Sequence, residues 1–305
     1  MSKRRGVILA VALEGRSQAE VALAYEVSAA TVSRWVARYR IEGDAAFEPR
    51  SRRPRTSPTA TPPEVVGLIV NLRVELTAEG LDAGPVTIRW HLQHRHGLDV
   101  SVATIRRHLV AAGLVIPNPK KKPKSAYIRF EADLPNECWQ SDVTHWRLAN
   151  RTDAEVLTWL DDHSRYALSV TAHRPVTAPA VVDTFLAAGA DQGFPASVLT
   201  DNGLVFTTRF ARGGNDGRNQ LETTLARLGI TQKNSRPNHP TTCGKVERFQ
   251  QTLKRWLRSQ PAAASITHLQ AQLDAFCQLY NHQRPHTSLR NRTPAVVYGL
   301  LPKTG

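Results

Sequence analysis

The sequence predicts a multi-domain protein in which two all-α units precede an α/β domain. Apolar residues recur at helical spacing in the first third of the chain, and strand-like runs begin at residue 139. Two proline-containing basic stretches separate these parts. We expect a first helical unit at 1–48, a linker at 49–62, a second helical unit at 63–116, a linker at 117–130, an α/β domain at 131–262 and a C-terminal helix with a basic tail at 263–305.

The first unit predicts three short helices within residues 6–41, with a tight turn before the third, Ala30–Arg40. Ser28 is a good N-cap for that helix. Four of its apolar residues recur at i, i+3, i+4 and i+7 and would face a small core: Val32, Trp35, Val36 and Tyr39. This layout is a helix-turn-helix, whose second helix enters the major groove of DNA. The residues expected to contact DNA there are Ser33, Arg34 and Arg38.

The second unit contains an echo of the first. Ser28–Val36 aligns with Ser101–Leu109, with serine, alanine, threonine and arginine shared and two apolar positions matched. Two tandem helix-turn-helix units explain the echo, although a purely structural trio of helices is the alternative for either. The outward residues here are Thr104, Arg106, Arg107 and His108, and the first three are the expected DNA contacts.

The charge distribution favours a polyphosphate partner. The chain carries a formal net charge of +14, and residues 1–130 hold 21 lysines and arginines against 11 acidic residues. In the second linker, Lys120, Lys121 and Lys122 are expected to contact DNA, while a solvated spacer is the alternative for either linker. Three widely spaced cysteines predict no disulfide framework or zinc knuckle, and a reducing cytoplasm fits them. The N-terminus is a poor secretion signal, and no apolar run is long enough to cross a bilayer.

The α/β part begins with strand-like runs in quick succession, typical of an antiparallel meander, and continues with alternating helices and strands. The expected strands are 139–147, 156–160, 166–171, 197–200 and 230–233. The expected helices are 178–190, 219–228, 245–258 and 266–281, followed by an irregular basic tail.

Three carboxylates in this part are candidates for a metal site. Asp142 lies in the first strand, Asp201 ends the fourth strand just before an Asn-Gly turn pair, and Glu247 lies on the helix 245–258. Mg²⁺ prefers oxygen ligands, and two ions about 3.5–4 Å apart can activate a nucleophile and stabilise the leaving oxygen at a phosphodiester. Taken singly, each has a plainer alternative: a strand-edge residue, a turn residue or a solvated helix residue.

Other polar residues have weaker claims. Asp161 and Asp162 end the second strand, where turn formation or a salt bridge with Arg165 is favoured over metal binding. His239 and His286 are expected in loops or packing, although either could approach DNA. Cys243 is expected to be a small packed residue rather than a nucleophile.

Three blocks of sequence resemble the core of DDE-type bacterial insertion-sequence transposases, which are similar to retroviral integrases. They are Trp139-Gln140-Ser141-Asp142-Val143-Thr144, Thr200-Asp201-Asn202-Gly203, and the run from Ser235 to Phe249 that contains Gly244-Lys245-Val246-Glu247-Arg248. The tail Tyr280-Asn281-His282-Gln283-Arg284-Pro285-His286, then Thr293-Pro294, resembles the segment that closes the core of that family. The resemblance covers residues 130–300.

The resemblance implies a ribonuclease H-like catalytic core, with a mixed five-stranded sheet flanked by helices. It implies a catalytic and metal-binding triad of Asp142, Asp201 and Glu247 with two Mg²⁺ ions, Mn²⁺ being a possible substitute. The implied partners are double-stranded DNA, as terminal inverted repeats and target, and further copies of the chain in a dimer or higher assembly. In the cell the protein would be associated with the nucleoid. The DNA contacts expected in the core are Asn202, Arg236, Lys245, Arg248, Lys254 and Arg258.

Two departures and two alternatives accompany this resemblance. The 45 residues between Asp201 and Glu247 exceed the usual family spacing, and Arg209–Gln220 accounts for the excess as a glycine-containing insertion. No His-His-Cys-Cys zinc unit precedes the core.

The predicted activity is cleavage at the ends of the element and joining of 3′-ends to target DNA. The alternatives are a catalytically inactive DNA-binding regulator derived from a transposase, and a nuclease of the same fold that cuts without joining.

Overall fold

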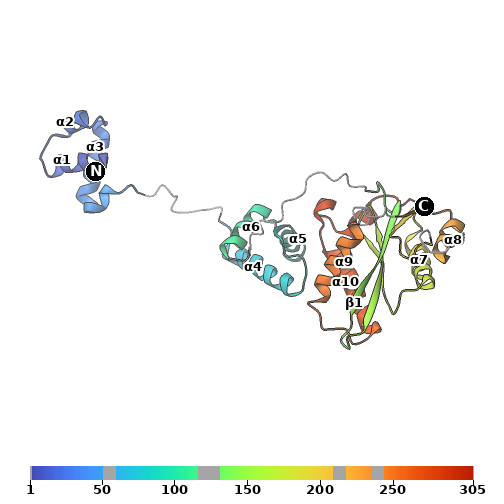
Figure 1. The fold of residues 1–305 in the computed structure, drawn as a ribbon. Helices are drawn as coiled ribbons and strands as arrows, with labels where there is room; N and C mark the ends of the chain where they lie inside the picture. Colours follow the sequence, from blue (N-terminus) through green and yellow to red (C-terminus); the bar gives the residue numbers. More distant parts are fainter. Residues whose placement is uncertain (1, 51–59, 116–130, 209–217, 235–243, 305) are drawn as a thin grey trace. The chain divides into compact units, whose positions relative to one another are not determined.

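The computed structural model describes residues 2–50, 60–115, 131–208, 218–234 and 244–304 (Figure 1). The chain divides into two compact units, Met1–Ala60 and Thr61–Gly305. Within the described ranges, no helix is long and apolar enough to cross a membrane. The predictions for Lys120, Lys121, Lys122, Arg236, His239 and Cys243, and for most of the Arg209–Gln220 insertion, fall outside those ranges.

The first unit contains the expected trio of helices. They are α1 (Lys3–Ala12), α2 (Gln18–Ala24) and α3 (Ala29–Glu42), followed by the short 3₁₀ helix η1 (Gly43–Phe47). Ser28 caps α3, because its Oγ accepts a hydrogen bond from the Thr31 amide at 3.3 Å. Val32 and Val36 are fully buried in the core of the trio. The helical spacing read from the sequence therefore identifies the packed face of α3.

The second trio repeats this cap. Its helices are α4 (Pro63–Ala78), α5 (Pro85–His96) and α6 (Val102–Ala111). Ser101 Oγ accepts from the Thr104 amide at 3.1 Å, as Ser28 does from Thr31, and Ile105 and Leu109 take the buried places of Val32 and Val36. The similarity between residues 28–36 and 101–109 thus corresponds to a helix with the same serine cap and the same buried positions in both units.

A mixed five-stranded sheet forms the α/β part. Its strands are β1 (Cys138–Arg147), β2 (Asp153–Asp161), β3 (Ala167–His173), β4 (Ser197–Thr200) and β5 (Thr231–Asn234), in the order β3-β2-β1-β4-β5. The first three pair antiparallel as a meander, whereas β4 runs parallel to both β1 and β5. The long β1 therefore lies at the centre of the sheet.

Helices cover both faces of this sheet (Figure 1). Helices α7 (Ala178–Gln192) and α8 (Gln220–Arg227) pack on the face that carries Trp139 and Trp159. Helices α9 (Gly244–Leu257) and α10 (Ile266–Gln283) pack on the opposite face, which carries Cys138, Val156 and Leu160. This second face also carries the even-numbered residues of β1, including Asp142, because side chains alternate along a strand.

The tail differs from the irregular segment that we expected. It contains the 3₁₀ turn η2 (Thr287–Leu289) and the helix α11 (Pro294–Leu300). Proline at the first position of α11 suits a helix start. The Tyr298 hydroxyl donates to Asn136 Oδ1 at 2.7 Å and its ring stacks on Tyr166, with ring centroids 4.6 Å apart. The irregular-tail prediction was wrong because these stabilising partners lie far away in the sequence.

Candidate active site

The strand register brings two of the candidate carboxylates together. Ser141 of β1 lies beside Thr200, the last residue of the parallel strand β4. The next residues along these two strands are Asp142 and Asp201. β4 ends at Thr200 while β1 continues to Arg147, so the turn after β4 places Asp201 beside Asp142 of the longer strand.

Helix α9 supplies the third carboxylate. Its buried face repeats at helical spacing and consists of Val246, Phe249, Leu253, Trp256 and Leu257. The Val246 amide donates to Gln140 Oε1 of β1 at 3.2 Å, which holds the first turn of α9 against the strand. Glu247 follows Val246 and is exposed to solvent.

The electrostatics of Asp142 record this convergence. Burial, followed by the charges of Asp201 and Glu247, raises the pKa of Asp142 to about 6, although hydrogen bonds from the Val143 amide and the Gln250 side chain act to lower it. The Gln250 amide nitrogen is itself buried and has no well-aligned hydrogen bond within the described ranges. A divalent cation would relieve the repulsion from Asp201 and Glu247, which adds to the larger effect of burial on this pKa.

The donor set fits Mg²⁺, which takes carboxylate oxygens and retains water ligands. Asp142 Oδ1 accepts from the Val143 amide at 2.9 Å, and Asp201 Oδ1 accepts from the Gly203 amide at 2.9 Å. In the described parts of the chain, no three acidic, histidine or cysteine side chains stand close enough to form a metal cage as they lie. The three carboxylates thus converge without enclosing an ion.

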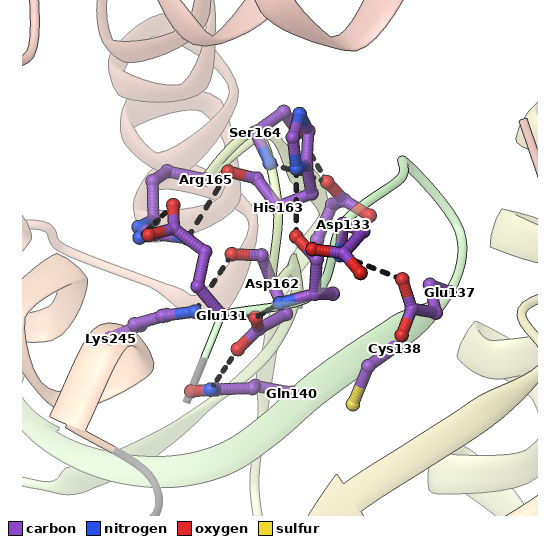
Figure 2. Close-up of polar contacts among 12 residues, drawn as sticks. Glu131, Asp133, Glu137, Cys138, Gln140, Asp162, His163, Ser164, Arg165 and Lys245 are labelled. Atoms are coloured by element: carbon purple, nitrogen blue, oxygen red, sulfur yellow. Dashed lines mark hydrogen bonds and ion pairs between the residues drawn. The ribbon is translucent and has the colours of Figure 1, made fainter. Parts of the chain in front are cut away.

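Figure 2 shows a network of polar groups around Asp162, to which Gln140 and Lys245 belong. Asp161 and Asp162 are both fully buried. Asp161 closes the turn after β2 by accepting from Ser164, as expected of a strand-end residue. The alternative salt bridge with Arg165 is not formed, because Arg165 pairs with Glu131 at 2.9 Å. Asp162 pairs with Lys245 instead.

The expected DNA contacts on the two helix-turn-helix units differ in exposure and in whether the side chain already bonds to its own unit. Ser33, Arg34, Arg106 and Arg107 are exposed, and Thr104 is half-buried beside its cap. The Arg38 guanidinium folds back onto its own unit, where its nitrogens donate to Glu42, to the Ala45 carbonyl and to the Glu48 carbonyl. Contact with DNA by Arg38 would have to compete with these three bonds.

The expected contacts on the core fall into two groups. Lys245 is held by Asp162 and its side chain is only 16% exposed, whereas Arg248 is exposed. Asn202 lies in the turn after β4, where its Oδ1 is 3.5 Å from Asn234 Nδ2. Lys254 and Arg258 line a groove of about 300 Å³ at the far end of β1, together with His145, Trp146, Arg147 and Asp153. Helix α9 therefore extends from the carboxylates to a basic groove.

Sequence reasoning missed three residues of this site. Gln140 binds the first turn of α9, Asp162 binds Lys245, and Gln250 lies against Asp142. Gln140 shares the strand face of Asp142, and Gln250 lies three residues after Glu247 on one helix face, so both positions were visible in the pattern. The partner of Asp162 was not, because it comes from a distant segment.

His286 is half-buried and packs against an aromatic side chain. Its ring packs edge-on against Tyr280, with ring centroids 5.1 Å apart. Burial, followed by the charge of Arg284, lowers the pKa of His286 to about 3. It therefore stays neutral at physiological pH and acts as a packing residue.

Comparison with family models identifies the core. Two models, both described as "Integrase core domain", match residues 132–240 and 228–294. The protein contains an integrase core domain. A "Helix-turn-helix domain" model matches residues 3–55, and a "Homeodomain-like domain" model matches residues 31–109. The helix-turn-helix prediction and the ribonuclease H-like fold are confirmed by these matches together with the sheet topology.

Relatives come from bacterial insertion elements and from retroviruses. An uncharacterized 31.7 kDa protein of insertion element IS407 from Burkholderia multivorans is 26% identical over 67% of this chain and 71% of its own length. An uncharacterized 39.2 kDa protein of IS476 from Xanthomonas euvesicatoria is 25% identical over 54% of this chain, which spans 44% of that protein. The Gag-Pro-Pol polyprotein of human T-cell leukemia virus 3 is 31% identical over 54% of this chain, which spans 10% of the polyprotein. The chain is an integrase-core protein related to those of bacterial insertion elements.

Similar solved structures include two retroviral assemblies. One is the simian T-cell lymphotropic virus intasome in complex with the PP2A regulatory subunit B56 gamma, with 21% identity and a TM-score of 0.46 over 72% of this chain and 77% of that chain. Another is the dimeric HTLV-2 integrase catalytic core in complex with magnesium, with 21% identity and a TM-score of 0.40 over 54% of this chain and 97% of that chain.

Proposed function

We propose that this protein is a DNA transposase that binds the terminal inverted repeats of an insertion sequence, cleaves at the element ends and joins the 3′-ends to target DNA. The observation that supports this most directly is how the three carboxylates are placed. The pairing of β1 with the parallel strand β4 sets Asp142 beside Asp201, and the bond from the Val246 amide to Gln140 holds the first turn of α9, which carries Glu247, against β1. The three carboxylates come from separate segments of a chain with a net charge of +14. Such a pairing of acidic centre and basic surroundings suits metal-assisted phosphoryl transfer on DNA.

The residues of the chain would divide the work as follows. Asp142, Asp201 and Glu247 would hold two Mg²⁺ ions, or Mn²⁺ in their place. The bound metal supplies activation of water or a 3′-hydroxyl and stabilisation of the leaving oxygen. The helix-turn-helix units deliver the duplex end, and Lys254 and Arg258 bind the phosphate backbone along α9. Synapsis of two ends requires at least two copies of the chain.

A strand-transfer assay on a labelled element end tests this function. The wild-type protein should cut and join in Mg²⁺, and Asp142→Asn, Asp201→Asn and Glu247→Gln should each bind the end without doing either. Full activity in any of the three variants would show that the substituted residue is not part of the metal site. A wild-type protein that binds the element end but never cuts it would be the regulator. A protein that cuts the element end but does not join a pre-cut end to target DNA would be a nuclease.

Arg34→Ala and Arg107→Ala should each weaken binding to the terminal repeat, because both side chains are exposed on the predicted recognition helices. For a contact to a base edge, the expected loss is about 1–3 kcal/mol and depends on sequence. Binding is measured by fluorescence anisotropy on repeat and scrambled duplexes at several salt concentrations.

Arg40→Ala is the matched control, because Arg40 is exposed in the last turn of the same helix, whereas the N-terminal residues of a recognition helix contact the base edges. Arg40→Ala should weaken binding to repeat and scrambled DNA equally, because it removes only a salt-dependent electrostatic contribution that does not depend on sequence. If Arg34→Ala and Arg107→Ala behave like this control, the recognition face is misassigned.

A further inference from the structure

The start of helix α9 is fastened to strand β1 by a side chain. The first four amides of a helix have no partner within the helix. One of these, the Val246 amide, donates to Gln140 Oε1 at 3.2 Å. Gln140 precedes Asp142 by two positions on the same face of β1, and Val246 directly precedes Glu247. One hydrogen bond thus sets the register between the strand that bears Asp142 and the helix that bears Glu247.

Asp162 contacts both Gln140 and Lys245, and so supports the bond between β1 and α9. Gln140 Nε2 donates to Asp162 Oδ1 at 2.6 Å, which fixes the orientation of the amide and turns its oxygen toward α9. The Lys245 ammonium, also on the first turn of α9, pairs with Asp162 Oδ2 and donates to the Asp162 carbonyl at 3.1 Å. Figure 2 shows Gln140 and Lys245 approaching the two sides of Asp162.

The Asp162 carboxylate is bonded to protein donors through both of its oxygens. Its Oδ2 also accepts from the Ala132 amide at 2.7 Å, and the residue has no solvent exposure. Both oxygens are therefore occupied by protein donors, so the side chain is not free to bind a metal ion. A buried ion pair contributes little net stability, because desolvation offsets the attraction, and its value lies in fixing one arrangement.

We infer that Asp162 is a positioning residue, which acts through Gln140 and Lys245 to fix the start of α9, and with it Glu247, relative to Asp142 so that both carboxylates can bind a metal ion. Glu247 is exposed, so packing does not fix its place, and the start of α9 must do so. Groups that orient metal ligands from behind typically change metal affinity or activity about 10–100-fold when they are replaced. This inference rests on the proposed triad.

The test compares Asp162→Asn with Lys245→Met and with the double variant, and uses Glu131→Gln as a control. Glu131 belongs to the neighbouring ion pair with Arg165, and it acts on Lys245 through its charge while forming, among the described residues, no hydrogen bond with Gln140 or α9, so its replacement separates an effect of charge from an effect of hydrogen bonding. Three quantities are measured for each full-length protein: Mn²⁺ affinity by electron paramagnetic resonance, the melting temperature, and kcat and KM for strand transfer.

Asp162→Asn should weaken Mn²⁺ binding and lower kcat, each by about 10–100-fold, with KM for the DNA end changed less than about twofold. Lys245→Met should lower the melting temperature most, because it leaves a buried carboxylate unpaired. The double variant should regain melting temperature relative to Lys245→Met without regaining kcat or Mn²⁺ affinity. Glu131→Gln should resemble the wild type in every measurement.

Two results would overturn the inference. Unchanged Mn²⁺ affinity in Asp162→Asn would show that Asp162 does not position the ligands. Recovery of kcat in parallel with melting temperature in the double variant would reduce Asp162 to a stabilising residue. The first result does not depend on strand transfer, because Mn²⁺ titration needs no DNA. A wild-type protein that binds Mn²⁺ but joins no strands would instead contradict the proposed function and leave the positioning result standing.

Discussion

Asp142→Asn should stabilise the metal-free protein and abolish strand transfer at the same time. Burial, Asp201 and Glu247 together raise the pKa of Asp142 to about 6, so its charge is unfavourable in the folded protein at neutral pH. One pKa unit corresponds to about 1.4 kcal/mol, and partial solvent access reduces the effect, so we expect a gain of about 1–2 kcal/mol at pH 7.5. Loss of a metal ligand removes several kcal/mol of transition-state stabilisation, or about 10³-fold or more in rate.

The gain in stability should depend on pH in a defined direction. The folded protein holds the Asp142 proton more tightly than the unfolded chain, so wild-type stability falls as pH rises from the unfolded pKa near 4 to the folded value of about 6. Asp142→Asn does not titrate and avoids this loss. The two proteins should therefore differ least below pH 4, diverge between pH 4 and 6, and stay apart above it. Urea unfolding in EDTA from pH 4 to 8 measures the difference.

Asp153→Asn provides the control for Asp142→Asn, since Asp153 is an exposed aspartate of the same sheet whose carboxylate lies 3.5 Å from Arg147. It should change stability by less than about 0.5 kcal/mol at every pH. Added Mg²⁺ should stabilise the wild type and Asp153→Asn by linkage, but not Asp142→Asn. Equal stabilisation of all three proteins by Mg²⁺ would place the metal site elsewhere.

Periodicity in the sequence was sufficient for the elements that present the site. The alternation along 139–147 put Gln140, Asp142 and Thr144 on one face, and helical spacing identified the buried face of α9. Both patterns arise from local geometry, period 2 in a strand and 3.6 in a helix, and both are written in consecutive residues. The five strands and the direction of the meander followed from the same reasoning.

Side-chain partners were beyond that reasoning, because they depend on which segments meet in three dimensions. Lys245 was expected at DNA, yet its ammonium is held by Asp162, 83 positions earlier in the chain. Arg38 was expected on an outer face, yet Gly43 turns the chain with a φ of +57° and returns the Ala45 and Glu48 carbonyls to its guanidinium. A long basic side chain bonds to whichever acceptor is nearest, and periodicity does not identify that acceptor.

Asp161→Asn should be among the most destabilising substitutions that preserve side-chain size in this protein. Asp161 Oδ1 accepts from the Ser164 amide at 2.7 Å and from Ser164 Oγ at 2.6 Å, and Oδ2 accepts from the Asn136 amide at 2.9 Å. The carboxylate has no solvent exposure and joins the turn after β2 to the segment that leads into β1. Asparagine keeps one acceptor and places an NH₂ group against at least one of these donors.

A buried donor left without an acceptor costs about 1–3 kcal/mol, and loss of a charge-assisted bond adds to it, so we expect about 3 kcal/mol and a melting temperature about 6–12 °C lower. Ser164→Ala is the graded comparison: it removes one donor and leaves the acceptor intact, and should cost about 1 kcal/mol. Differential scanning calorimetry at pH 7.5 measures both. Equal melting temperatures for Asp161→Asn and the wild type would mean that the carboxylate is not the group that closes this turn.

The contrast with the adjacent residue sharpens this prediction. Asp161 bonds only to the turn and to the start of the core, whereas Asp162 reaches α9 through Gln140 and Lys245. Asp161→Asn should therefore lower stability while the molecules that remain folded keep their Mn²⁺ affinity. Asp162→Asn should show a large loss of Mn²⁺ affinity in a protein that still folds. Two buried aspartates, adjacent in sequence and alike in exposure, would thus separate stability from positioning, because what each carboxylate is bonded to determines its effect.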